Sequence, residues 1–263
     1  MTLRIAPSGD QPLRIAPSSD QPLRIAMWSG PRNISTAMMR SFSSRADCAV
    51  SDEPFYGCFL KASGADHPMR EDVIASMDCD WRSVAAALAG PAPGGRPIWY
   101  QKHMPHHMVG PIAPDDLDGV VHAFLIRDPA RMAASYAAKR ETVTPEDLGV
   151  AAQRAFFDRE ADRTGTAPPV VDSADVLRDP AGTLAALCAA LGIAWDPAML
   201  SWPAGRHPAD GVWAEHWYGR VEASTGFDAA ETAPLALPPA LADVVDACRA
   251  DYDALMQYRL VAA

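Results

Sequence analysis

The stretch "IAMWSGPRNISTAMMRSF", Ile25–Phe42, combines three local signals that decide how this chain folds. Its first four residues are apolar and predict a short buried strand. Gly30 and Pro31 then predict a sharp turn, and from Ile34 onward the residues favour a helix. A strand, a turn and a helix in this order direct free backbone N–H groups at an anion, so the stretch predicts an anion-binding loop.

The turn carries the groups that such a site needs. Backbone N–H donors are expected from four consecutive residues: Asn33, Ile34, Ser35 and Thr36. The last two add hydroxyl groups, and Arg32 adds a fork-shaped cation suited to phosphate or sulfate oxygens. The alternative interpretation is an ordinary helix start with Ser and Thr near its cap.

The loop departs from the nucleotide-hydrolysing pattern GxxxxGK[ST]. Counted from Gly30, that pattern requires glycine at Ser35 and lysine at Thr36, and both are absent. The segment "PRNIST", residues 31–36, instead resembles the loop of sulfotransferases that use 3′-phosphoadenosine-5′-phosphosulfate, whose bacterial members read much like "PRSGTT". Ile34 stands where that family usually has glycine, and a β-branched residue resists a positive φ angle. The resemblance implies that the loop holds the 5′-phosphosulfate of the donor.

A second segment, "LIRDPARMAASY" at residues 125–136, supports the same resemblance. The family's second signature is an Arg at a strand end and a Ser eight positions later, and Arg127 with Ser135 has that spacing. The resemblance implies that the two hold the 3′-phosphate, with a bidentate cation and one hydrogen bond from about two helical turns away. The alternative is that Arg127 pairs with Asp128 and Ser135 lies on the surface.

Two further segments resemble the family more weakly. Residues 170–200 are similar to its late strand and helix, although packing alone explains most of that pattern. The segment "WYGRVEASTGF", residues 217–227, is similar to the closing segment of bacterial and plant relatives. That likeness implies a donor-binding role for Arg220, while the alternative is a solvated loop arginine.

Two residues are candidates for the base that the implied reaction requires. Glu53 lies in "SDEPFYG" after the second predicted strand, where several relatives use a Glu as base. His103 lies in "YQKHMP", which resembles the "KTHLP" motif of the cytosolic sulfotransferases, whose His is the base. An imidazole titrates near neutral pH, whereas a carboxylate needs a raised pKa to act there. We rank Glu53 slightly ahead, with His103 as its partner or substitute.

The third expected catalytic residue is Arg32, which suits stabilisation of the leaving phosphate oxygen because its charge is permanent. The run "HMPHH", with His106 and His107, also invites a metal interpretation. Zinc needs three or four ligands in a set geometry, and no Cys cluster accompanies these residues, so no metal is expected. We interpret the two histidines as part of a loop surface or of the acceptor wall.

The rest of the chain alternates strand and helix patterns. Strands are predicted at residues 23–28, 48–51, 97–101, 119–126 and 168–173. Helices are predicted at residues 34–43, 80–89, 130–139, 145–163, 179–192 and 238–258. This alternation predicts an α/β three-layer sandwich with a central, mostly parallel sheet, similar to P-loop NTPases. Residues 202–238 lack a regular pattern, and an irregular segment of that length is usually a functional loop or lid.

The N-terminus contains a duplication, because "LRIAPSGDQP" is followed by "LRIAPSSDQP". We expect residues 1–22 to be a flexible extension, and residues 23–263 to form one domain. The net charge of −10 argues against nucleic acid or an anionic membrane as a partner. No apolar run reaches the length of a membrane span. The five scattered cysteines suit free thiols, so a cytoplasmic protein is expected.

Three functions remain open from the sequence. The first is a sulfotransferase with 3′-phosphoadenosine-5′-phosphosulfate as donor and a hydroxyl on a small molecule, carbohydrate or lipid as acceptor. The second is a P-loop kinase or NTPase with a degenerate loop, in which Asp128 would serve magnesium. The third is a nucleotide-binding module on the same fold without catalysis.

Overall fold

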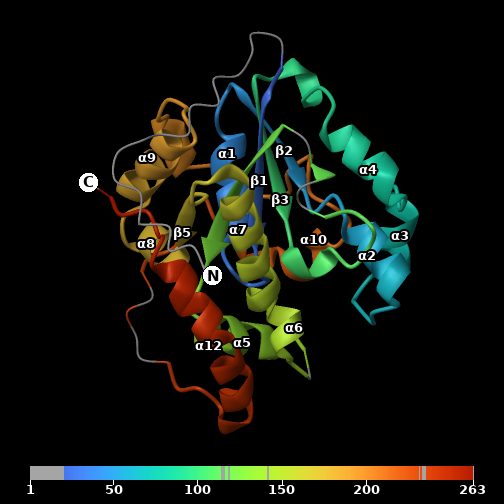
Figure 1. Cartoon of the computed structure of the whole chain (residues 1–263), viewed down its shortest axis with the longest axis vertical. Helices are drawn as coiled ribbons and strands as arrows, with labels where there is room; N and C mark the ends of the chain where they lie inside the picture. Colours follow the sequence, from blue (N-terminus) through green and yellow to red (C-terminus); the bar gives the residue numbers. More distant parts are fainter. Residues whose placement is uncertain are drawn as a thin grey trace.

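The computed structural model describes residues 21–113, 116–117, 119–140, 142–230, 232 and 235–262. The duplicated segment therefore lies outside the described residues, apart from its last two positions. The described chain forms a central sheet covered by helices on both faces (Figure 1). None of the helices in the described part is long and apolar enough to cross a membrane.

The sheet has five strands in the order β2-β3-β1-β4-β5, and every pairing between neighbours is parallel. The strands are β1 (Leu23–Ser29), β2 (Cys48–Asp52), β3 (Ile98–His103), β4 (Val120–Ile126) and β5 (Val170–Asp172). The central strands β1 and β4 are buried along their whole length, as parallel strands covered on both faces must be. The predicted α/β architecture is therefore confirmed.

Each face of the sheet packs against its own set of helices, with a separate apolar core. One face is covered by α1 (Ser35–Ser43), α8 (Ser173–Arg178) and α9 (Pro180–Ala190). The other is covered by α4 (Trp81–Leu88), α5 (Pro129–Ala137), α7 (Val150–Thr164) and α12 (Ala242–Met256). In Figure 1 the red α12 lies beside α5 and near α7.

A smaller third core lies beside the sheet. It joins α2 (Tyr56–Ser63), α3 (Arg70–Ser76) and α10 (Ala214–Trp217). The remaining short elements are α6 (Pro145–Leu148), α11 (Gly219–Glu222), η1 (Pro93–Gly95), η2 (Pro105–His107), η4 (Pro197–Leu200) and η5 (Pro239–Leu241). The irregular segment expected at 202–238 thus contains two short helices, and one of them belongs to this core.

The main differences from the predicted elements have local causes. The helix expected at 145–163 is divided, because Gly149 adopts a left-handed φ of 68° that ends α6 before α7 begins. Residues 56–76 carried no prediction and form α2 and α3. The helix expected from residue 34 begins at Ser35, with Ile34 as its left-handed cap.

The topology determines where a ligand site can lie. The chain leaves β1 for β2 on one side and later returns to β4 on the other side, so the strand order reverses next to β1. In open parallel sheets, ligands bind outside the carboxyl ends of the strands at such a reversal. Here those ends carry the loop after β1, Glu53 after β2, Lys102 near the end of β3 and Arg127 after β4.

Candidate active site

The loop between β1 and α1 is held in an uncommon backbone conformation. Arg32 and Ile34 both have positive φ angles, 58° and 40°. The Ile34 side chain packs against the apolar core, and the Asn33 side-chain amide donates a 2.6 Å hydrogen bond to the Leu125 carbonyl. Such conformations cost about 1–3 kcal/mol each and persist only where surrounding contacts enforce them. Ile34 therefore adopts the backbone region that a glycine would take, despite its β-branched side chain.

The loop also depends on a close approach between chain segments. A Cβ atom at Gly30 would overlap the Leu148 carbonyl and the end of the Met132 side chain, so only glycine fits there. From α7, the Gln153 amide donates 2.9 Å hydrogen bonds to the carbonyls of Trp28 and Leu125. These contacts fix the carboxyl ends of β1 and β4 relative to each other, which sets the position of the loop.

The N-terminus of α1 is open to an anion. Its cap, Ile34, has no side chain that could accept from the first N–H groups, and the first turn contains no acidic residue. The first four N–H groups of a helix have no partner inside the helix. The helix dipole adds a partial positive charge at the same place. The end of α1 is therefore suited to bind phosphate or sulfate oxygens.

Arginines from two loops meet at this helix end. Arg127 donates from Nη1 to the Arg32 carbonyl, and Arg32 donates from Nε to the Ser135 hydroxyl at 3.1 Å. Burial lowers the pKa of Arg32, and the nearby charges of Arg127 and Arg220 lower it further. Arginine stays protonated in proteins, so these positive charges are held together at a cost that a bound anion would relieve.

Arg220 reaches the same place from α11. Its side chain is 76% exposed and forms a 3.0 Å ion pair with Asp228. All of the residues expected to bind the donor line one cavity of about 460 Å³, and Glu53 lines it too. The donor-binding set is Arg32, Asn33, Ile34, Ser35, Thr36, Arg127, Ser135 and Arg220.

His103 is the exception among the expected site residues. It is buried in the core, where its ring stacks on Trp28 at a centroid distance of 4.7 Å and its Nε2 lies 3.3 Å from the Gln101 side chain. Burial, with a contribution from His122, lowers its pKa to about 3. The reason is the alternation of side chains along β3, which turns His103 and Lys102 to opposite faces. His103 does not line the cavity, and we do not retain it as a base.

Lys102 is the partner of Glu53, the position that the sequence interpretation gave to the adjacent His103. Its ammonium donates to Glu53 Oε1 at 2.6 Å and to Asp52 Oδ1 at 2.8 Å. Burial disfavours this charge, but the two carboxylates outweigh burial and hold the pKa of Lys102 well above its usual value. Glu53 is 8% exposed and has a positive φ of 47°. Burial raises its pKa, although Lys102 opposes the rise.

Tyr218, just after α10, completes this network. Its hydroxyl accepts from Lys102 at 2.6 Å and from Trp213 Nε1 at 3.0 Å, and it donates to Asp52 at 2.7 Å. From the sequence, Tyr218 is one of several aromatic residues that could line an acceptor pocket or pin the irregular segment, and Asp52 and Lys102 are only neighbours of the two candidate bases. Adjacency to a candidate was the only available signal, because the contact joins segments up to 166 residues apart.

The remaining wall of the cavity is aromatic and contains neutral histidines. Tyr56 stacks on His107 with a centroid distance of 4.7 Å and an angle of 3°, and its hydroxyl lies 2.9 Å from His67 Nδ1. Burial lowers the pKa of His67 to about 4 and that of His106 to about 3. Within the described residues, no group of three or more His, Cys, Asp or Glu side chains is arranged to hold a metal ion.

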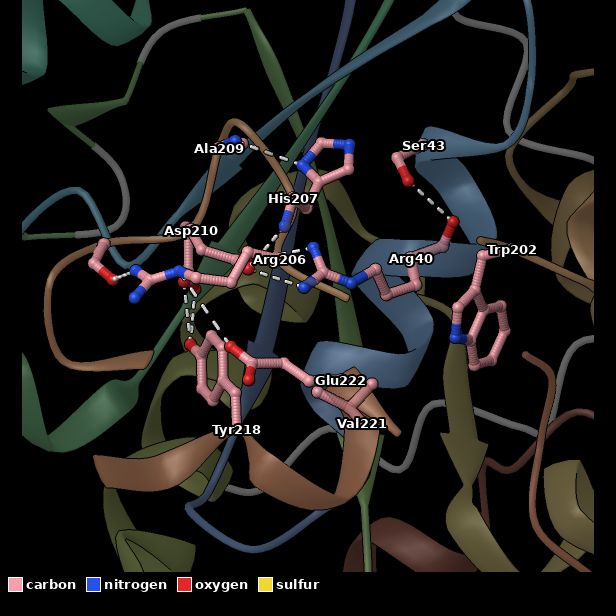
Figure 2. Close-up of polar contacts among 12 residues, drawn as sticks. Arg40, Ser43, Trp202, Arg206, His207, Ala209, Asp210, Tyr218, Val221 and Glu222 are labelled. Atoms are coloured by element: carbon pink, nitrogen blue, oxygen red, sulfur yellow. Dashed lines mark hydrogen bonds and ion pairs between the residues drawn. The ribbon is translucent and has the colours of Figure 1, made fainter. Parts of the chain in front are cut away.

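The irregular segment forms one side of the cavity and is anchored to α1. Figure 2 shows Arg40 of α1 reaching Asp210, with hydrogen bonds of 2.7 and 2.6 Å between side chains that are 2% and 1% exposed. The backbone N–H of His207 donates to the same carboxylate at 2.8 Å. This buried pair holds the segment that supplies Tyr218 and Arg220 against the helix that follows the loop.

Comparison with known proteins identifies a family and two curated relatives. A family model described as "Sulfotransferase domain" matches residues 23–259. Two curated relatives from Arabidopsis thaliana are named branched-chain-amino-acid aminotransferase-like protein 2 and protein 1. They are 32% identical over 231 residues and 35% identical over 222 residues, which is 87% and 83% of this chain. The matches cover only 40% and 39% of the relatives, so this chain spans about two fifths of their length.

Among solved structures, the chain is similar to the sulfotransferase domain from the curacin biosynthetic pathway. The TM-score is 0.47 at 14% identity, covering 92% of this chain and 100% of that one. The family assignment depends on the sequence model, whose match runs from the first residue of β1 to beyond the end of α12. This chain belongs to the sulfotransferase-domain family.

Proposed function

We propose that this protein transfers a sulfuryl group from 3′-phosphoadenosine-5′-phosphosulfate to a hydroxyl group of a small-molecule, carbohydrate or lipid acceptor. The observation that carries the proposal is the convergence of Arg32, Arg127 and Ser135 on the uncapped N-terminus of α1, with Glu53 in the same cavity. A cation cluster at a helix end binds a polyanionic donor, and a buried carboxylate beside it takes a proton.

The donor-binding residues divide by position. The N–H groups of residues 33–36 and the Arg32 guanidinium would hold the 5′-phosphosulfate, because they surround the end of α1. Arg127 and Ser135 would hold the 3′-phosphate from the end of β4 and the next helix. Arg220 adds a third guanidinium from α11. No metal is required by this scheme, because these groups are permanent cations or neutral donors.

Sulfuryl transfer requires a group that accepts the proton of the acceptor hydroxyl and groups that stabilise the charge on the leaving oxygen. Glu53 accepts the acceptor's proton as the acceptor oxygen bonds to sulfur, and the bond between sulfur and the bridging phosphate oxygen breaks. Arg32 and the loop N–H groups stabilise the negative charge that develops on that oxygen. The raised pKa of Glu53, caused by its burial, brings its proton affinity closer to neutral pH, where a base works best.

The hydrogen bonds of Asp128 argue against a magnesium-dependent kinase. Its Oδ1 accepts from the N–H groups of Ala130 and Arg131, and its Oδ2 accepts from Arg249 at 2.9 Å. The strand-end carboxylate that would hold magnesium is therefore committed to capping α5 and pairing with α12. With no lysine at Thr36, the loop also lacks the cation of nucleotide-hydrolysing enzymes.

Ligand binding tests the proposal first. Adenosine 3′,5′-bisphosphate is expected to raise the thermal unfolding midpoint, because a ligand at 100 times its dissociation constant stabilises the folded state by about 2.7 kcal/mol. ATP with magnesium serves as the comparison. Stabilisation by ATP with magnesium alone would overturn the proposal. A screen for sulfated products formed from radiolabelled donor then tests catalysis.

Arg127→Ala is expected to weaken bisphosphate binding by about 10- to 100-fold, because it removes charge-assisted hydrogen bonds to the 3′-phosphate. Arg127→Lys should recover part of the loss. Arg154→Ala is the control, since Arg154 pairs with Asp158 on α7 outside the cavity. Calorimetric titration measures all three. Unchanged affinity in Arg127→Ala would show that Arg127 does not hold the phosphate.

A further inference from the structure

A buried polar network lies directly behind Glu53. All three protons of the Lys102 ammonium are directed to partners, at 2.6 Å to Glu53, 2.8 Å to Asp52 and 2.6 Å to the Tyr218 hydroxyl. The side chains of Lys102 and Asp52 are 1% and 0% exposed. Neither Asp52 nor Tyr218 has a part in the proposed donor binding. Both nevertheless accept a hydrogen bond from Lys102, the residue that holds the proposed base.

We propose that Asp52 and Tyr218 are positioning residues that act through Lys102 on Glu53. They fix the lysine so that it holds Glu53 Oε1 and leaves Oε2 for the acceptor hydroxyl, and they set how strongly Glu53 takes the proton. This inference rests on the proposed function in treating Glu53 as the base. Asp52 does not line the cavity; Tyr218 does, but its hydroxyl is bonded to Lys102, Trp213 and Asp52.

The hydrogen-bond pattern fixes the direction of each contact. Lys102 and Trp213 Nε1 both donate to the Tyr218 oxygen, so its own proton points to Asp52, at 2.9 Å from Oδ1 and 2.7 Å from Oδ2. Asp52 therefore receives one proton from Tyr218 and one from Lys102. Glu53 Oε1 receives the third proton of Lys102, and the two carboxylates share one positive charge.

This sharing controls the proton affinity of Glu53. A negative neighbour disfavours a second ionised carboxylate, and a cation favours it. Burial raises the pKa of Glu53, Lys102 lowers it, the Asp52 carboxylate raises it and the Tyr218 hydroxyl lowers it. Asp52 and Tyr218 therefore act on the base in opposite directions, although they are bonded to each other.

The histidine and the tyrosine beside Glu53 add no charge near neutral pH. From η2, His107 Nδ1 lies 3.9 Å from Glu53 Oε2. Burial, with the neighbouring His106, holds the pKa of His107 well below its usual value, so the ring is neutral. From α2, Tyr56 is also neutral, because burial and Glu53 itself raise its pKa. The groups that act most directly on the pKa of Glu53 are thus Lys102, Asp52 and Tyr218, while the donor-site arginines in the same cavity are the same in wild type and variants.

The proposal predicts opposite effects for two conservative substitutions. Asp52→Asn removes the negative neighbour, so the pKa of Glu53 should fall and the acid limb of turnover against pH should move about one unit lower. Tyr218→Phe removes the hydrogen bond from Tyr218 to Asp52. The Asp52 carboxylate then interacts more strongly with the Lys102 ammonium, which leaves Lys102 less able to stabilise ionised Glu53. The pKa of Glu53 should rise and the same limb should move to higher pH, by up to about one unit.

A buried pair elsewhere in the fold supplies matched controls. Tyr252 of α12 donates to Asp172 at 3.0 Å, away from the cavity, so Tyr252→Phe and Asp172→Asn remove the same kind of contact. These controls should keep the wild-type pH profile. The proposal is overturned if Asp52→Asn and Tyr218→Phe lower turnover equally at every pH without moving the acid limb, or if both variants move the limb in the same direction. If Asp52→Asn fails to fold, the direction of the Tyr218→Phe shift alone decides.

A second readout separates this inference from the proposed function. Difference infrared spectroscopy, with Glu53→Gln as the reference, follows the titration of the Glu53 carboxyl group without any turnover. Opposite shifts of that titration support the network even if the wild type transfers no sulfuryl group, in which case only the proposed function fails. An unshifted titration in both variants, with an active wild type, overturns the network and leaves the proposed function standing.

Discussion

Glu53→Gln is expected to lower the turnover number by about 10²- to 10⁴-fold, the usual contribution of a positioned general base. Gln keeps the shape of the side chain and one carbonyl oxygen for Lys102, so the cavity should persist. The acid limb of the pH profile should disappear, because the group that titrates is gone. Steady-state kinetics with a labelled donor, once an acceptor is found, measures both effects.

Two further measurements make this result specific to the base. The affinity for adenosine 3′,5′-bisphosphate should remain close to that of the wild type, since Glu53 holds no donor phosphate in the proposed scheme. Glu160→Gln, in a surface pair with Arg163 on α7, should leave turnover unchanged. A Glu53→Gln variant with turnover near wild type would mean that another group takes the acceptor's proton.

Lys102→Met is expected to destabilise the fold by about 3–5 kcal/mol, the usual cost of leaving a buried charge unpaired. Two carboxylates, Asp52 and Glu53, would lose the single ammonium between them. Because the pKa of Lys102 is held well above its usual value in the folded protein, its stabilising effect is present throughout the neutral range and is lost only at high pH. Urea unfolding at pH 7 measures the change.

A combined variant tests the cause of that loss. Adding Glu53→Gln and Asp52→Asn to Lys102→Met removes the unpaired charges and should recover a substantial part of the stability. Lys61→Met, at an exposed position near the end of α2, is the control and should change stability by less than about 0.5 kcal/mol. A Lys102→Met variant as stable as this control would show that the cluster is not charged as described.

The cluster of arginines at the start of α1 followed from the sequence because its signals are local. A strand, a turn and a helix are encoded within residues 25–42, and parallel topology brings the carboxyl ends of successive strands to one edge. The positions of Arg32 and Arg127 at that edge follow from these rules. Ile34 was expected to resist a positive φ, and the structure shows φ at 40°, because contacts of the loop with the core and with β4 outweigh a preference of the isolated residue.

The proposed base shows the limit of local signals. Along β3, neighbouring side chains point to opposite faces, so His103 and Lys102 cannot both face the cavity. The motif likeness favoured His103, whereas the structure buries it against Trp28 and turns Lys102 to Glu53. Which of two adjacent residues faces a site depends on which face the sheet presents to it, and one residue of register decides that.

The sequence by itself determined the parallel α/β architecture and the two strand–turn–helix units that carry Arg32 and Arg127, because each unit is encoded locally and parallel topology brings the ends of such strands to one edge. Only the tertiary structure decided how Glu53, the proposed base, is held. Asp52, Lys102 and Tyr218 come from two strands and a distant irregular segment, with separations of 50, 116 and 166 residues. The three side chains are strongly coupled only once the fold excludes water around them, because charges and hydrogen bonds interact more strongly in a buried environment of low dielectric constant.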